Sequence, residues 1–188
     1  MSKIVVFNGS PHTNRTTAAL LNAVADGAKS KGAEIVHYDL NAKYIRGCQD
    51  CGGCRREGRE DAEMICVQDD YLKPAYKDVF EATGIVLGTP IYGGNVTAQT
   101  LTFLQRLRPF RDSERKSLIP GKSFITVITH ANPNKEQYLE RIGELQRVFT
   151  NYGWEDAGKV IWAGARLEDS GLPEEMQKES FEAGERLA

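Results

Sequence analysis

The chain has 188 residues, with 24 Lys and Arg against 26 Asp and Glu and a formal net charge of −2 at pH 7. This length suits one domain with a full core, so we expect a single domain over residues 1–188. The near-neutral charge gives no broad positive field, which argues against nucleic acid and anionic membranes as partners. The sequence shows neither a membrane-spanning apolar run nor a signal-peptide pattern, and it therefore predicts a cytoplasmic protein.

Short apolar runs alternate with segments of helical periodicity along the chain. The first run, residues 3–8, stops at a Gly-Ser-Pro turn, as a strand buried on both faces does. Further strands are expected at 34–40, 84–88, 122–129 and 156–163, and helices at 16–31, 69–82, 97–108, 135–152 and 173–187. This alternation predicts an α/β fold of three layers, in which helices cover both faces of a five-stranded parallel sheet of order 2-1-3-4-5.

The loop after the first strand has the sequence GSPHTNRTT, residues 9–17. In such sheets ligands bind beyond the carboxyl ends of the strands, and a helix N-terminus there offers free N–H groups to an anion. The loop lacks a Walker lysine and the G-x-G-x-x-G spacing, so it suits a flavin monophosphate better than a reacting triphosphate. A well-capped helix after an ordinary turn is the alternative interpretation.

Two more loops are expected at the same edge of the sheet. The second contains TPIYGGN, residues 89–95, in which a Gly-Gly turn lets backbone N–H groups approach a planar ring while Tyr92 offers a flat apolar face. Tyr92 is alternatively a rim aromatic packed on its own loop. The third loop begins at Thr129 and would approach the other side of the ring, although a loop histidine such as His130 is more often satisfied locally than a proton donor.

All four cysteines lie in one polar segment at about residues 41–68: Cys48, Cys51, Cys54 and Cys66. Clustered cysteines in a cytosolic chain indicate a metal site, redox chemistry or free thiols rather than a disulfide framework. The C-x2-C-x2-C spacing suits iron–sulfur or zinc, and four reduced thiols without metal is the other interpretation. The neighbouring Arg55, Arg56 and Arg59 are candidates for the extra phosphate of NADPH, but the acidic residues among them favour a solvated loop.

The segments GSPHTNRTT and GTPIYGGN, together with the cysteine cluster, resemble the NADPH-dependent FMN reductase and iron-sulfur flavoprotein group of the flavodoxin-like fold. The resemblance covers about residues 3–107 and implies bound FMN with NADPH or NADH as electron donor. It implies that the phosphate is bound by Ser10, Asn14, Thr16 and Thr17. It implies that the ring is held by Pro90, Ile91, Tyr92, Gly93, Gly94 and Asn95. The expected cofactor-binding set also includes His12, where relatives often carry Arg, and Thr129 and His130.

The implied function is an FMN-dependent NAD(P)H oxidoreductase that passes electrons to a quinone, a flavin or another small acceptor, with the chemistry carried by the flavin rather than by a catalytic side chain. One alternative is an iron-sulfur flavoprotein that carries electrons through a 4Fe-4S cluster on Cys48, Cys51, Cys54 and Cys66. Another is a flavin- or zinc-binding interaction module without turnover. A small redox protein is a further candidate acceptor, and the resemblance implies a homodimer or homotetramer.

Overall fold

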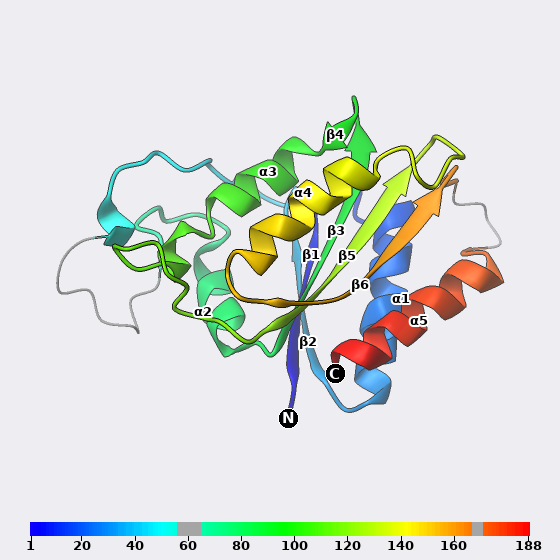
Figure 1. Cartoon of the computed structure of the whole chain (residues 1–188), viewed down its shortest axis with the longest axis horizontal. Coiled ribbons are helices and arrows are strands. Elements are labelled where there is room, and N and C mark those ends of the chain that lie inside the picture. The colour runs from blue at the N-terminus through cyan, green and yellow to red at the C-terminus, as the bar shows by residue number, and fades with distance from the viewer. Residues whose placement is uncertain (56–64, 167–170) are drawn as a thin grey trace.

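The computed structural model describes residues 1–55, 65–166 and 171–188, and its centre is a twisted sheet (Figure 1). Five strands run parallel in the order β2-β1-β3-β5-β6, which is the flavodoxin-like order predicted from the sequence. Their bounds are Lys3–Asn8 (β1), Glu34–Asp39 (β2), Gly84–Tyr92 (β3), Ser123–His130 (β5) and Glu155–Ala163 (β6). The short strand β4, Asn95–Val96, pairs antiparallel with the end of β3, so the sheet has six strands rather than the five expected.

Helices cover both faces of the sheet, which confirms the three-layer prediction (Figure 1). One face carries α1 (Thr16–Ser30) and α5 (Glu174–Leu187). The other carries α2 (Lys73–Glu81), α3 (Ala98–Gln105) and α4 (Leu139–Thr150). Among the described residues, no helix is long and apolar enough to cross a membrane.

Strand β1 shows why the sequence of the sheet is so continuously apolar. Ile4 and Val6 pack under α1 and α5, whereas Val5 and Phe7 pack under the helices of the opposite face. All four side chains are fully buried. A strand covered on both faces has no solvent-facing positions, so its apolar residues do not alternate with polar ones.

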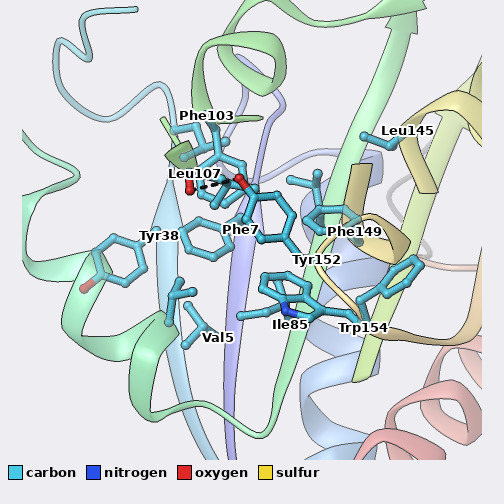
Figure 2. Close-up of a cluster of buried hydrophobic side chains, with 14 of the residues drawn as sticks. Val5, Phe7, Tyr38, Ile85, Phe103, Leu107, Leu145, Phe149, Tyr152 and Trp154 are labelled. Atoms are coloured by element: carbon cyan, nitrogen blue, oxygen red, sulfur yellow. Dashed lines mark hydrogen bonds between the residues drawn. The ribbon is translucent and has the colours of Figure 1, made fainter. Parts of the chain in front are cut away.

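The core on the α2, α3 and α4 face is rich in aromatic rings (Figure 2). Phe7 lies 5.5 Å from Tyr38 and 4.2 Å from Phe103 between ring centroids. The Tyr152 hydroxyl donates a 3.0 Å hydrogen bond to the carbonyl of Leu107, the dashed line in Figure 2. Because the buried hydroxyl of Tyr152 has a hydrogen-bond partner, this bond compensates for its desolvation and connects the segment after α3 to the core.

Helices α1 and α5 touch backbone to backbone at two glycines. A Cβ on Gly27 would lie 1.9 Å from the carbonyl oxygen of Phe181, and one on Gly184 would lie 1.9 Å from that of Val24. The absence of a side chain at both positions therefore permits this close crossing. The N-terminus of α1 lies at the candidate site.

Several predicted boundaries are wrong. Helix α2 begins at Lys73 instead of Asp69, because the neighbouring carboxylate of Asp70 bonds Arg106 and the Leu72 amide instead of opening a helix. Strand β3 runs through Tyr92, past the expected stop at Pro90. The Gly88 carbonyl faces β1, where it accepts a hydrogen bond from the Gly9 amide. Backbone groups alternate sides along a strand, so the nitrogen of Pro90 also faces the side of β1. Because β1 ends at Asn8, opposite Gly88, a proline is tolerated there.

Candidate functional site

A cavity of about 420 Å³ opens at the carboxyl ends of β1, β3, β5 and β6. Most of the predicted cofactor-binding residues line it: Ser10, His12, Thr16, Thr17, Pro90, Ile91, Tyr92, Thr129 and His130. The lining does not include Asn14, Gly93, Gly94 or Asn95. The structure thus brings the three predicted loops together around one space.

The loop after β1 is shaped by the side chain of Asn8. Its amide oxygen accepts a 3.0 Å hydrogen bond from the Ser10 amide, and its amide nitrogen donates to the His12 carbonyl at 3.2 Å. Gly9 packs so tightly that a Cβ there would lie 2.0 Å from the hydroxyl oxygen of Thr100. These contacts shape the loop and place the buried Ser10 at the cavity.

The N-terminus of α1 carries no side-chain cap. Its N-cap residue is Arg15, and the first turn contains no acidic residue. In contrast, Thr97 caps α3 by accepting a hydrogen bond from the Thr100 amide. The first amide groups of α1 are thus free to bind an anion beside the hydroxyls of Thr16 and Thr17. This open end favours the anion site over the interpretation as a well-capped helix.

Thr17 and His130 connect the cavity to the sheet. The hydroxyls of Thr17 and Thr129 lie 2.9 Å apart and are buried, which joins α1 to β5. His130 donates from Nδ1 to the carbonyl of Asn132 at 2.8 Å, because a carbonyl can only accept. Its Nε2 is buried and has no hydrogen-bond partner within the described part of the chain.

The β3–β4 hairpin forms one edge of the cavity. Tyr92 is half exposed at this edge, with 52% of its surface accessible. Gly93 and Gly94 form the turn with φ values of +57° and +79°, which favour glycine. The side chain of Asn95 accepts from the Val96 amide at 2.8 Å, so it is used within the hairpin.

Sequence reasoning missed four residues that line the cavity: Arg15, Ala131, Ala165 and Arg166. Arg15 lies inside the predicted loop, but only hydroxyl and amide groups were considered there. Ala165 and Arg166 follow β6, an edge strand where no ligand loop was expected. The available signal was an arginine in each of two segments that follow a strand.

The cysteines lie apart from this cavity. Cys48, Cys51, Cys54 and Cys66 together line a second, small cavity, beside Arg106 and Arg108. All four cysteines are thiols in the structure. Among residues 1–55, 65–166 and 171–188, no three metal-binding side chains are close enough to hold a metal ion. The thiols therefore share one place and have suitable chemistry, but they are not arranged as ligands. Arg56 and Arg59 lie outside the described residues.

Helix α3 lies between the two cavities. Its N-cap hydroxyl, on Thr97, donates to the Gly9 carbonyl at 2.6 Å, next to the first cavity. Gln105 and Arg106, at the other end of α3, line the cysteine cavity. Eight helical residues span about 12 Å, so the two cavities are separate.

Arg106 anchors the cysteine segment to α2 and α3. Its buried guanidinium donates to the Asp70 carboxylate at 2.6 and 3.1 Å, to the Arg46 carbonyl at 2.6 Å and to the Tyr76 hydroxyl at 3.2 Å. Burial by itself would raise the pKa of Asp70, but hydrogen bonds from Arg106 and the Arg46 amide outweigh it and hold this pKa below its ordinary value. Both ends of the segment, at Arg46 and Asp70, thus meet at one cation.

Comparison with known proteins places this geometry in a family. Residues 2–147 match the family described as NADPH-dependent FMN reductase. The chain belongs to this family. Membership confirms the resemblance found in the sequence and the oxidoreductase class expected from it.

Two similar proteins are named iron-sulfur flavoproteins. An iron-sulfur flavoprotein from Archaeoglobus fulgidus is 27% identical over 186 residues, which cover 99% of this chain and 79% of the relative. An iron-sulfur flavoprotein from Methanocaldococcus jannaschii is 33% identical over 108 residues, 56% of this chain, and the match spans 50% of the relative. The chain thus matches only about half the length of the second relative.

A solved structure shows the same fold at low identity. It is an NAD(P)H:quinone oxidoreductase from Methanothermobacter marburgensis, with a TM-score of 0.75 and 13% identity. The similarity covers 100% of this chain and 99% of that one. At this identity the similarity supports the flavodoxin-like architecture and says nothing of the substrate.

Proposed function

We propose that the chain binds FMN in the 420 Å³ cavity and passes electrons from a reduced nicotinamide to a small acceptor such as a quinone or a free flavin. The observation that carries this proposal is the uncapped N-terminus of α1, which opens with the hydroxyls of Thr16 and Thr17 into a cavity that also reaches the ends of β3 and β5. An anion site and a flat apolar wall within one space match a phosphorylated planar cofactor.

The residues present fit FMN in a definite orientation. Ser10, Thr16 and Thr17, with the free amides of α1, would bind the phosphate, and Arg15 would add a charge. The ring would lie between Pro90–Tyr92 on one side and Thr129 and His130 on the other. Contacts from Asn14, Gly93, Gly94 and Asn95, which adjoin the cavity lining in sequence, stay predictions. Bound FMN would supply hydride and electron chemistry, while the apolar wall at Pro90 and Ile91 excludes water.

The test is activity before and after removal of the flavin. We expect protein purified without oxygen to show a two-banded flavin spectrum that bleaches on adding NADPH. Stripped protein should lose quinone-dependent NADPH oxidation, and added FMN should restore it. Undiminished activity in stripped protein, or failure of stripped protein to take up FMN, would overturn the proposal. A panel of a benzoquinone, free FMN and a small ferredoxin would identify the acceptor class.

A second candidate function is electron transfer through a 4Fe-4S cluster at the cysteines. It is supported by the four thiols, which line one cavity together, because iron–sulfur clusters are held by cysteine thiolates. It predicts iron and acid-labile sulfide in anaerobic preparations, and Cys54→Ser should lower both without changing the FMN content. Zinc without reductase activity would instead support the interaction module.

We also propose a homodimer or homotetramer. The support is an apolar groove between α3 and α4, formed in part by Val96, Leu101, Leu104, Leu145 and Val148. Leu101 is 42% exposed there. Light scattering on purified protein tests this, and a monomer at micromolar concentration would contradict it.

A further inference from the structure

Two arginines flank the large cavity, Arg15 at the start of α1 and Arg166 after β6. Both side chains are exposed, and within the described residues neither guanidinium has an ion pair or a hydrogen bond. Among the described residues, the cavity lining contains no Asp or Glu. Two guanidinium groups without a partner in this part of the chain are suited to bind anions.

Arg166 is held in place through its backbone neighbours. The Gly164 amide donates to the Asn132 carbonyl at 2.8 Å, and the Ala165 amide donates to the His130 carbonyl at 2.9 Å. Gly164 has a φ of +64°, a conformation that favours glycine and turns the chain back toward the loop after β5. These bonds fasten the loop that carries Arg166 to the cavity wall at His130.

The position of β6 separates Arg166 from the loop proposed for the FMN phosphate. That loop follows β1, and β6 lies three strands away in the order β1-β3-β5-β6. At about 4.8 Å per strand, the two strand ends are about 14 Å apart. The ring of FMN is proposed between β3 and β5, so Arg166 enters from the side of the ring opposite β1. In the proposed binding mode, Arg15 and the free amides of α1 bind the FMN phosphate.

We propose that Arg166 binds a phosphate group of the reduced nicotinamide nucleotide, the electron donor. This inference rests on the proposed FMN-dependent function. The planar guanidinium donates paired hydrogen bonds to phosphate oxygens. Both NADPH and NADH carry a pyrophosphate, and NADPH has an additional 2′-phosphate.

The test compares Arg166→Ala and Arg166→Lys with Arg147→Ala, a change of an exposed arginine on α4 outside the cavity. FMN-loaded proteins are assayed for kcat and KM with NADPH and with NADH, and NADP⁺ binding is followed by calorimetry. We expect Arg166→Ala to raise the KM for NADPH and the Kd of NADP⁺ about tenfold, as loss of a charged hydrogen bond does. The Kd of FMN should stay unchanged, Arg166→Lys should recover part of the loss, and Arg147→Ala should match the wild type.

The outcomes separate the phosphates. A larger loss with NADPH than with NADH assigns Arg166 to the 2′-phosphate, and equal losses assign it to the pyrophosphate; both support the inference. An unchanged KM and Kd for the nucleotide, or weakened FMN binding in their place, would overturn it. Wild-type protein that binds no FMN would overturn the proposed function as well, whereas an active, FMN-loaded wild type beside an unaffected Arg166→Ala variant would overturn this inference alone.

Discussion

Buried hydroxyl groups differ in their contacts along β5. Thr129 shares a 2.9 Å hydrogen bond with Thr17 at the cavity, whereas Thr126, three residues earlier, is equally buried and its hydroxyl has no partner among the described residues. The same isosteric change from Thr to Val can therefore be made at the Thr17–Thr129 hydrogen bond, where the hydroxyl has a partner, and at Thr126, where it has none among the described residues.

We expect Thr17→Val to weaken FMN binding, because it removes one hydroxyl from the proposed phosphate site and breaks the bond to Thr129. A charged hydrogen bond is worth about 1.5–3 kcal/mol, so the Kd of FMN should rise by about tenfold or more. Fluorescence titration of stripped protein measures it.

The matched control is Thr126→Val. It should leave the Kd of FMN unchanged and should keep or raise stability, since it removes a buried polar atom that has no partner. Equal FMN affinity in both variants would remove Thr17 from the phosphate site.

His130 shows how far local sequence reasoning reaches. The interpretation as a satisfied loop histidine describes Nδ1, which bonds the Asn132 carbonyl two residues away. It does not describe Nε2, which is buried without a partner among the described residues, or the edge contact of the ring with Tyr138 at the start of α4, with ring centroids 5.0 Å apart. A contact two residues away follows from a loop sequence, but packing against another helix does not.

The attachment of the cysteine segment depends on one buried ion pair between α3 and the start of α2. The Arg106 side chain is 1% exposed and that of Asp70 is 11% exposed. We expect Asp70→Asn to lower the free energy of unfolding by about 3 kcal/mol, because it leaves a buried cation without its counter-charge. The control is Asp69→Asn, which removes only the exposed pair with Lys73 and should cost less than about 1 kcal/mol. Urea unfolding at pH 7 compares them.

The ion pair between Arg106 and Asp70 also predicts how the stability of the protein depends on pH. The pKa of Asp70 is lowered in the folded protein, so its contribution is present above the unfolded pKa of about 3.9 and is lost as the pH falls through the folded value. The stability difference between wild type and Asp70→Asn should therefore be full at pH 6 and shrink at pH 3. Urea unfolding across this range checks it, and a difference that grows on acidification would contradict the assignment.

The crossing of α1 and α5 leads to a prediction about glycine. Gly184→Ala should lower the free energy of unfolding by about 2 kcal/mol, because its Cβ would meet the backbone oxygen of Val24, which cannot move as a side chain can. Gly143→Ala on α4 has no heavy atom within 4 Å and should raise stability by about 0.5–1 kcal/mol. Opposite signs in chemical denaturation are expected, and equal effects would contradict the close crossing.

The cavity joins segments from most of the chain, from Ser10 to Arg166. A ligand that binds only the folded form therefore stabilises the whole molecule. FMN at about 100 times its Kd should raise the free energy of unfolding by about 2.7 kcal/mol, and its removal should reverse this. At the same concentration, riboflavin should stabilise less because it lacks the phosphate. Scanning calorimetry measures both, and equal stabilisation by the two would contradict the anion site at α1.

Much of the architecture follows from local pattern. Runs such as Lys3–Asn8 and helical spacing from Thr16 onward predicted the five parallel strands, their order and the helices on both faces. The loop after β1 and the end of β3 were also recognisable, because ligands in such sheets bind beyond the carboxyl ends of the strands. These features depend on residues close together in the chain.

Contacts between distant residues decided the rest. Asp70 bonds Arg106, 36 positions away, and α2 starts after it; Gly184 meets the backbone of Val24, which brings α5 close to α1. Arg166 reaches the cavity because its loop bonds to the one after β5, and α3 places the cysteines at a separate site. Sequence periodicity records which faces are buried, but not which buried groups meet, because partner choice depends on how whole elements pack in three dimensions.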